Sequence, residues 1–224
     1  MSIVFIAPDA DLARRYRQIL AAVPDQVEVV EALLSEAIPL ARQLEEQGAE
    51  VFVARGGTAM LLRRAGIKSP IVEIHLTSAD IVQALTEAKN KAHSDHPAIA
   101  IVAFPGMIQN LLDFLPLLSL PLACHALTSE EDAPRRVEEA IVAGAQVLLG
   151  GAITVKIARD RGVPGVLLQS GEKSIRQALE EARRIVYARR IEARRSNELK
   201  AMRSPRSRGS PGTGRSTRSG PSIG

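Results

Sequence analysis

Two glycine-containing turns hold the residues best suited to bind a ligand. The first turn is Arg55-Gly56-Gly57-Thr58, and the second is Gly150-Gly151 with Thr154. Because glycine has no side chain, backbone N–H groups can approach a bound molecule, and a helix that starts at each threonine favours an anion. Arg55 adds a fixed positive charge suited to a carboxylate or phosphate. Glycine and threonine are ordinary in strand-to-helix turns, so one turn alone indicates only local structure, whereas two related turns favour a ligand site.

Two histidines near residue 95 have a spacing that could bring two imidazoles to one metal ion. His93 and His96 flank Asp95. Pro97 follows directly, and only these few ligands are close in the sequence. We therefore interpret this polar segment as a linker between two lobes, and we predict no metal site.

Two further pairs of residues are of types that can act in catalysis. Cys124 and His125 are adjacent on a predicted strand, where neighbouring side chains point to opposite faces, so they are poorly placed to act as nucleophile and base. Glu73 and His75 lie at the end of another predicted strand, facing the expected site. An enzyme of the chelatase or decarboxylase kind that uses Glu73 and His75 stays an alternative, although the sequence shows no acid–base pair with a third, orienting residue.

Short β-rich runs and amphipathic helical segments alternate along the chain and would position these turns. We expect strands over residues 3–7, 27–30, 51–54, 71–74, 99–104, 122–126, 147–149 and 166–169. We expect helices over residues 12–20, 35–47, 58–65, 78–91, 105–115, 130–143, 154–161 and 172–202. Alternation at this pitch predicts an α/β fold with parallel sheets and helices on both faces.

The two halves of this pattern resemble each other. Residues 51–58 align with residues 147–154 at an offset of 96, and residues 81–85 align with residues 175–179 at an offset of 94. This order predicts a tandem duplication with two Rossmann-like, three-layer lobes facing each other across a cleft. In open parallel sheets ligands bind beyond the carboxyl ends of the strands, which is where both glycine turns fall.

Four segments follow from these patterns. We predict a first α/β lobe over residues 1–93 and a second over residues 97–171. A long helix over residues 172–202 would pack back on the first lobe and lead out of the body. Residues 203–224 consist almost entirely of Ser, Pro, Arg, Gly and Thr, which predicts a disordered basic tail.

The positive net charge belongs to the C-terminal end. The chain has a formal net charge of +4, yet residues 1–171 contain 15 basic and 20 acidic residues, and the remainder contains 14 and 5. The tail has no aromatic residue for base stacking, so we expect no specific nucleic-acid binding. No apolar run is long enough to cross a bilayer, no basic leader opens the chain, and Cys124 is the single cysteine. These features predict a cytoplasmic protein without a membrane partner.

Several motifs together resemble the N-terminal sensor domain of the propionate catabolism activator family, in consistent order over roughly residues 1–196. The motifs are residues 51–59, 70–74 and 78–85, Gly150-Gly151 with Thr154, residues 165–170 and the helix at 176–179. The resemblance implies a chelatase-like pair of α/β lobes. Members of this family are sigma-54-dependent transcription activators in which an ATPase module and a helix-turn-helix DNA-binding module follow the sensor domain. Founding members sense 2-methylcitrate, a small tricarboxylate.

Carried over by position, the resemblance implies a ligand-binding set with no catalytic residue, metal or cofactor. The set is Arg55, Gly56, Gly57, Thr58, Glu73, His75, Gly150, Gly151, Thr154, Gln169 and Ser170. To it we add Ser78, and Phe104, which ends a strand of the second lobe and would either cover the ligand or pack in the core. This sequence departs from the family because it has no Walker-type loop and reaches the low-complexity tail where a further module would begin. We therefore expect a truncated chain without ATPase or DNA-binding modules of its own.

The first hypothesis is a non-enzymatic sensor that binds a small anionic metabolite, such as a di- or tricarboxylate, between two lobes. The enzyme that uses Glu73 and His75 is the second. The third hypothesis is a truncated chain that associates with a full-length regulator. The C-terminal helix would mediate this association and could also join copies of this chain into a homo-oligomer.

Overall fold

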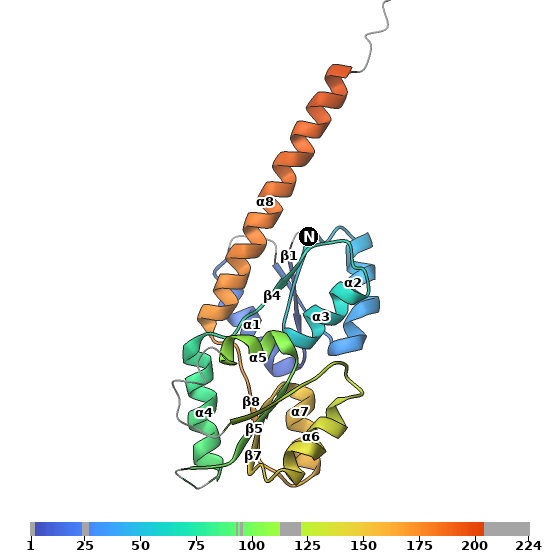
Figure 1. The fold of residues 1–224 in the computed structure, drawn as a ribbon. Helices are drawn as coiled ribbons and strands as arrows, with labels where there is room; N and C mark the ends of the chain where they lie inside the picture. The colour runs from blue at the N-terminus through green and yellow to red at the C-terminus, as the bar shows by residue number, and fades with distance from the viewer. Residues whose placement is uncertain (1–2, 24–26, 93, 95, 113–121, 204–224) are drawn as a thin grey trace, which may run out of the picture. The chain divides into compact units, whose positions relative to one another are not determined.

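The computed structural model describes residues 3–23, 27–92, 94, 96–112 and 122–203, and it contains two four-stranded parallel sheets (Figure 1). The first sheet has the order β2-β1-β3-β4, and the second has the equivalent order β6-β5-β7-β8. The strands are β1 (Ile3–Ala7), β2 (Val27–Glu31), β3 (Val51–Ala54), β4 (Ile71–Glu73), β5 (Ile99–Ala103), β6 (Leu122–Ala126), β7 (Val147–Gly150) and β8 (Gly165–Leu167). The predicted fold class, two tandem α/β lobes with a long C-terminal helix, is confirmed.

Strand register extends the internal repeat. Ile3 lies opposite Val51 in the first sheet, and Ile99 lies opposite Val147 in the second. Both pairs are related by the offset of 96 residues found in the sequence. The two halves therefore share their strand pairing as well as their order of elements.

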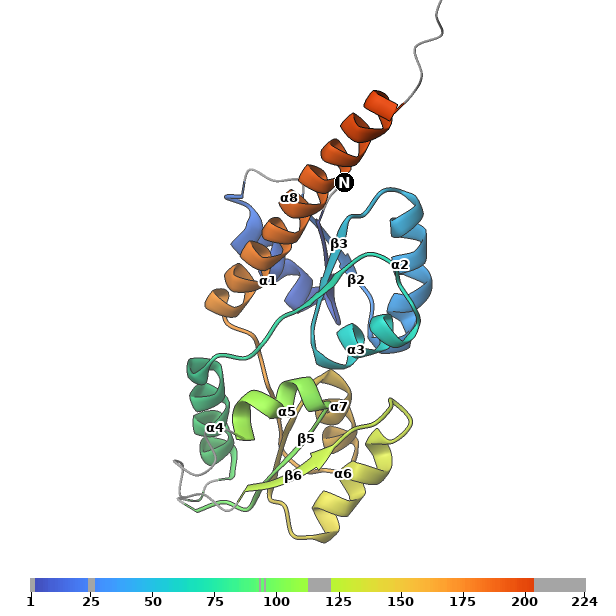
Figure 2. The ribbon, with the colours of Figure 1, turned by 45° about the horizontal axis from the view of Figure 1, so that its top comes forward.

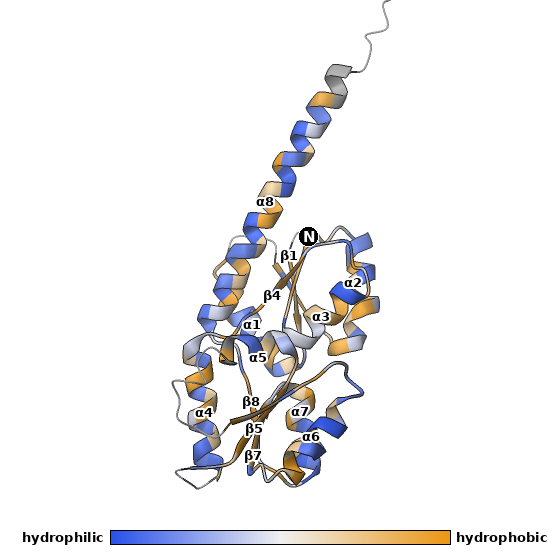
Figure 3. Ribbon diagram, viewed as in Figure 1, coloured by the Kyte–Doolittle hydropathy of each residue, from blue (hydrophilic) through white to orange (hydrophobic). Residues whose placement is uncertain are grey.

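Helices cover both faces of each sheet, which gives three layers per lobe (Figure 2). The helices are α1 (Ala10–Leu20), the short 3-10 helix η1 (Leu34–Glu36), α2 (Ala37–Glu46), α3 (Gly56–Arg64), α4 (Ser78–Ala92), α5 (Pro105–Leu112), α6 (Ala133–Val142), α7 (Ala152–Asp160) and α8 (Glu172–Arg203). The strands are largely apolar, while the helices mix apolar and polar residues (Figure 3). This is the pattern expected when sheets are buried between helices.

Four glycines end helices at repeat-related positions. Gly48 and Gly144 have φ of +96° and +95°, and Gly66 and Gly162 have φ of +71° and +70°. Only glycine adopts this left-handed conformation without a steric cost, so these residues stop the preceding helices. The helices predicted over residues 35–47, 58–65, 130–143 and 154–161 each end directly before one of these four glycines.

The two lobes exchange a helix, which corrects one predicted boundary. We placed residues 78–91 in the first lobe, but α4 packs on the second sheet through Ile81, Ala84, Leu85 and Ala88. In return, α8 packs on the first sheet through Ile175, Ala178, Leu179, Ala182 and Val186. The chain therefore crosses between the lobes before α4 and again before α8.

The C-terminal segments have a different character. The described residues up to Ala188 form one compact unit, and those from Arg189 to Arg203 belong to a second. Residues 189–199 of α8 are almost all exposed. The predicted tail lies outside the described residues from position 204, as do His93, Asp95 and the last three residues of the helix predicted over 105–115.

Candidate functional site

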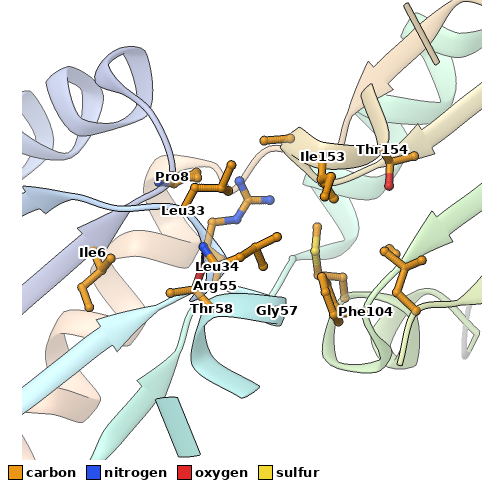
Figure 4. A pocket seen from close by; sticks show the side chains of 15 residues that line it. Ile6, Pro8, Leu33, Leu34, Arg55, Gly57, Thr58, Phe104, Ile153 and Thr154 are labelled. Atoms are coloured by element: carbon orange, nitrogen blue, oxygen red, sulfur yellow. Dashed lines mark hydrogen bonds between the residues drawn. The ribbon is translucent and has the colours of Figure 1, made fainter. Parts of the chain in front are cut away.

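A small pocket lies where the carboxyl ends of the two sheets meet, within the compact unit. Its volume is about 50 Å³. Figure 4 shows that Pro8, Leu33, Leu34, Arg55 and Thr58 lie on one side, and that Phe104, Ile153 and Thr154 lie on the other. The position beyond the strand ends is the one predicted for this class of sheet.

Arg55 is the one cationic residue in the lining of this pocket. It follows β3 at the start of α3, is only 8% exposed, and donates a hydrogen bond to the backbone oxygen of Leu168 in the other lobe. No carboxylate among the described residues forms an ion pair with it. Burial lowers the pKa of Arg55, opposed by the electrostatic influence of Tyr16 and Asp9. An arginine nevertheless stays charged, so the pocket contains a buried cation on which Asp9 and Asp80 act only from beyond ion-pair distance.

Two helix N-termini converge on the pocket. α3 starts at Gly56 and α7 starts at Ala152, and neither helix has a side chain capping its first N–H groups. Both helices begin two residues earlier than predicted, so the two threonines lie inside the first turn. Unpaired N–H groups at these ends add a partial positive charge to that of Arg55.

The two threonines stabilise the walls of the pocket. Thr58 Oγ accepts a hydrogen bond of 3.2 Å from the backbone N–H of Leu34. Thr154 Oγ donates a bond of 2.7 Å to the backbone oxygen of Val102. In the described part of the chain the Thr58 hydroxyl accepts this bond and donates none, so its hydrogen can donate to a ligand.

Leu34 adopts an unusual backbone conformation at this site. Its φ is +50°, which makes it the one non-glycine residue with positive φ in the described part of the chain. A branched side chain in this region is strained, and such strain concentrates at functional sites. The contact with Thr58 is one of the interactions that hold Leu34 there.

The glycines of the first turn allow the two lobes to touch. A Cβ on Gly57 would lie 2.3 Å from the Phe104 ring and 2.7 Å from Leu34, and one on Gly56 would lie 2.7 Å from Met107. Close contact with Phe104 and Met107, both from the second lobe, thus explains why glycine occupies these positions.

We expect Gly57→Ala to lower the free energy of unfolding by about 1–2 kcal/mol, because the new methyl group would overpack the contact with Phe104. Urea unfolding followed by circular dichroism measures this. Gly151→Ala is the matched control, since its Cβ would lie 3.9 Å from the nearest atom. Equal stability of the two variants would contradict the close contact between α3 and Phe104.

The pocket brings together part of the predicted ligand-binding set. The members that line it are Arg55, Gly57, Thr58, Phe104, Gly151 and Thr154. Gly56 and Gly150 lie behind this surface, packed against Met107 and against the backbone oxygen of Val102.

The other residues of this set do not line the pocket. Glu73 forms a 2.8 Å ion pair with Arg63, and Gln169 accepts a 2.9 Å hydrogen bond from Arg15. His75 and Ser78 are exposed. Ser170 is fully buried, and its hydroxyl has no hydrogen-bond partner in the described part of the chain.

Most of the apolar lining was not predicted from the sequence. The missed residues are Ile6, Pro8, Leu33, Leu34, Ala103, Met107, Leu127, Ala152 and Ile153. Several of them lie at or just after a strand end, including Pro8, Ala103 and Leu127. Inspection of every strand end, rather than the glycine turns alone, would have found these three.

The candidate nucleophile and base considered from the sequence do not line this pocket. Cys124 and His125 are on the edge strand β6 and are absent from its lining. Among the described residues no three His, Cys, Asp or Glu side chains are grouped closely enough to bind a metal ion. None of the described helices is sufficiently long and apolar to span a bilayer.

Known proteins place this fold in a family. Residues 24–192 match the propionate catabolism activator family. An NtrC family transcriptional regulator from Clostridium acetobutylicum has a similar structure, with a TM-score of 0.72 and 20% identity over 84% of this chain and 98% of that one. A weaker likeness, with a TM-score of 0.46 and 10% identity over 83% and 84%, is to an ABC domain in complex with L-Trp from Streptococcus pneumoniae.

No curated protein matches the sequence. The family match nevertheless covers most of the chain, and the structural likeness to the Clostridium regulator shows the same two-lobed fold. The chain belongs to the propionate catabolism activator family, as a sensor domain of transcription regulators.

Proposed function

We propose that the chain senses a small anionic metabolite, which binds in the pocket between the two lobes. The observation that carries this proposal is Arg55, a buried cation without a carboxylate partner among the described residues. Burying a charge is costly unless an opposite charge compensates it, and the N-termini of α3 and α7 face the same space. A bound anion would provide that compensation.

Signal transmission would use the chain crossing before α8. This helix begins directly after the second sheet, while its residues 175–186 pack on the first. A change in the angle between the lobes must therefore move α8 relative to one of them. A ligand drives such a change only if it binds one arrangement more tightly than the other.

The family resemblance implies di- and tricarboxylates, with 2-methylcitrate as one member. A ligand of that size would require the lobes to separate, because the pocket measures about 50 Å³. The regulatory role, the cytoplasmic location and the association through the C-terminal helix stay predictions. The ATPase and DNA-binding modules would belong to full-length relatives.

The enzyme alternative receives little support from the geometry. Glu73 forms an ion pair with Arg63, and neither Glu73 nor His75 lines the pocket. We therefore propose a sensor without catalysis.

Isothermal titration calorimetry at pH 7.5 tests the requirement for an anion. We expect saturable binding for at least one carboxylate in a panel of mono-, di- and tricarboxylates, and at least tenfold weaker binding of the corresponding neutral amide. A carboxylate and its amide have nearly the same shape, so the difference measures the charge interaction with Arg55. Absence of binding across the panel, or equal binding of acid and amide, would overturn the proposal.

A further inference from the structure

We infer that the hydroxyl groups of Tyr16 and Ser170 join Arg55 in holding one carboxylate of the ligand. This role rests on the proposed function and names the donors that bind the charged group. Tyr16 lies outside the set of ligand-binding residues predicted from the sequence. Ser170 belongs to that set but does not line the pocket.

Two buried hydroxyl groups have no hydrogen-bond partner in the described part of the chain. They are Tyr16 Oη on α1 and Ser170 Oγ between β8 and α8, and both residues are 0% exposed. Among the described residues, Glu28 Oε2 is the one other buried side-chain atom in this condition. Burial of a hydroxyl without a partner is unfavourable, so two such groups at one contact point to a ligand that accepts from both.

Both hydroxyls belong to the contact that α1 and Arg55 make with residues 168–170 of the other lobe. Arg55 donates a hydrogen bond to a backbone oxygen of this segment, and Arg15, next to Tyr16 on α1, donates to one of its side chains at 2.9 Å. Ser170 ends the segment. The Tyr16 hydroxyl and Arg55 are also close enough that each influences the pKa of the other. A cation and two hydroxyl donors therefore meet at one lobe contact.

These three groups are suited to a carboxylate. Arg55 has five N–H donors and a permanent positive charge. Burial raises the pKa of Tyr16 to about 12, so its hydroxyl keeps the hydrogen at neutral pH and can donate it. The two oxygens of a carboxylate accept about four hydrogen bonds. One carboxylate can therefore use the cation and both hydroxyls together.

The acidic side chains near Arg55 are bonded to other donors. Asp9 and Asp80 influence the pKa of Arg55 but form no ion pair with it among the described residues. Asp9 Oδ1 accepts a 2.8 Å hydrogen bond from the backbone N–H of Leu12 and so caps α1. Asp80 accepts from the segments that precede α4 and α8. An acceptor for the two hydroxyls must therefore come from outside the described chain.

Ligand binding would exchange the partner of Arg55. Because both hydroxyls are buried, a ligand reaches them when the lobes separate at this contact. That separation breaks the hydrogen bonds from Arg55 and Arg15 to residues 168–170. The ligand carboxylate then replaces the backbone oxygen as the acceptor for Arg55, and it accepts from Tyr16 on one lobe and Ser170 on the other.

Calorimetry on the full chain with acetate, succinate, citrate and 2-methylcitrate tests the role of each hydroxyl. Tyr16→Phe removes the hydroxyl and keeps the ring, which packs edge-on against Phe5. We expect roughly tenfold weaker binding of each carboxylate that the wild type binds, since a hydrogen bond to a charged group is lost. Ser170→Ala should have a similar effect. Urea unfolding should show no loss of stability in either variant, because neither hydroxyl has a partner to lose.

Tyr187→Phe is the matched control. Tyr187 is 69% exposed on α8 and does not line the pocket, so both affinity and stability should stay at the wild-type values. If Tyr16 were only a structural residue, Tyr16→Phe would show the reverse pattern, with lower stability and unchanged affinity. That pattern would overturn the inference.

The control variant also provides a direct signal from Tyr16. The chain has two tyrosines and no tryptophan, so Tyr16 is the one tyrosine left in Tyr187→Phe. A phenol that donates a hydrogen bond to a carboxylate absorbs at longer wavelength. We expect a saturable red shift of the tyrosine absorption band, with the same Kd as calorimetry gives. Saturation without a shift would contradict a bond from Tyr16 to the ligand.

The outcomes distinguish these donors from the proposed function itself. Unchanged affinity in Tyr16→Phe or Ser170→Ala would overturn the role of that hydroxyl, and an anion sensor that relies on Arg55 would stay in place. Failure of all four carboxylates to bind to the wild type would overturn both the donor role and the proposed function.

Discussion

Replacing Arg55 with methionine is expected to stabilise the free protein by about 1–2 kcal/mol and to abolish binding of carboxylates. A buried charge without a partner carries a desolvation penalty of several kcal/mol, and an apolar side chain of similar length removes that penalty. The variant loses the hydrogen bond to the Leu168 backbone oxygen, which offsets part of the gain. An increase in stability coupled to a loss of binding indicates a residue kept for its function.

Thermal and urea unfolding measure the first effect, and calorimetry with the carboxylate panel measures the second. Arg42→Met is the matched control, because Arg42 is exposed and, among the described residues, hydrogen-bonds only to the backbone oxygen of Ala65. We expect the control to change stability by less than about 0.5 kcal/mol and to leave binding intact. A marked loss of stability in Arg55→Met would contradict the conclusion that burial of this charge without an ion-pair partner destabilises the free protein.

The fold follows closely from the sequence because its signals are local. Alternating strand and helix patterns, together with glycines at positions 48, 66, 144 and 162, predict the elements and their order. The internal repeat then predicts two equivalent sheets, and the strand register agrees with it.

Only half of the helix exchange was predicted. We expected residues 172–202 to pack back on the first lobe, as α8 does, but we kept residues 78–91 in the first lobe. The apolar residues of α4 and α8 show that each helix buries one stripe, but they do not show against which sheet. The repeat aligns these two helices, so it predicts that they are equivalent. Equivalent helices satisfy this pattern equally well when both stay in their own lobe and when both cross.

Some residues of the site could be predicted from the sequence, and others could not. Arg55 and the glycine turns are recognisable because charge and glycine are unusual at the end of an apolar strand. Leu34, Met107 and Ile153 are not, since an apolar side chain in a pocket wall has the same sequence signature as one in the core. Whether such a residue lines the pocket or the core depends on where the two lobes contact each other, which the sequence does not show.

Asp80→Ala is expected to lower the free energy of unfolding by about 2–4 kcal/mol. The Asp80 carboxylate accepts hydrogen bonds from the backbone N–H and hydroxyl of Thr77, from the backbone N–H of Gly171 and from the Ser174 hydroxyl, at 2.6–2.9 Å. These donors come from both chain crossings, so one carboxylate joins the starts of α4 and α8. Its loss leaves buried donors unpaired, each at a cost of about 1–3 kcal/mol. Asp80→Asn keeps one oxygen acceptor and should lose less.

The pH dependence of this effect has a definite sign. Burial raises the pKa of Asp80, but the hydrogen bonds from Ser174, Thr77 and Gly171 together outweigh it and lower the pKa below its ordinary value. The stabilisation by the Asp80 carboxylate is therefore fully present above the pKa of Asp80 in the unfolded chain, about 4. It is lost as the pH falls through the lower pKa of Asp80 in the folded protein. Urea unfolding of wild type and Asp80→Ala should show a constant difference from pH 5 to 8 that narrows below pH 4.

An exposed aspartate at an equivalent helix position provides the control for Asp80. Asp11 lies in the first turn of α1 and pairs with Arg14 at 3.2 Å, with both side chains largely exposed. Because exposed pairs are worth little, Asp11→Ala should cost less than about 0.5 kcal/mol. If both variants lost the same small amount, Asp80 would be an ordinary helix-start residue and not the link between the two crossings. A large loss confined to Asp80 would show that the lobes depend on this link for their stability.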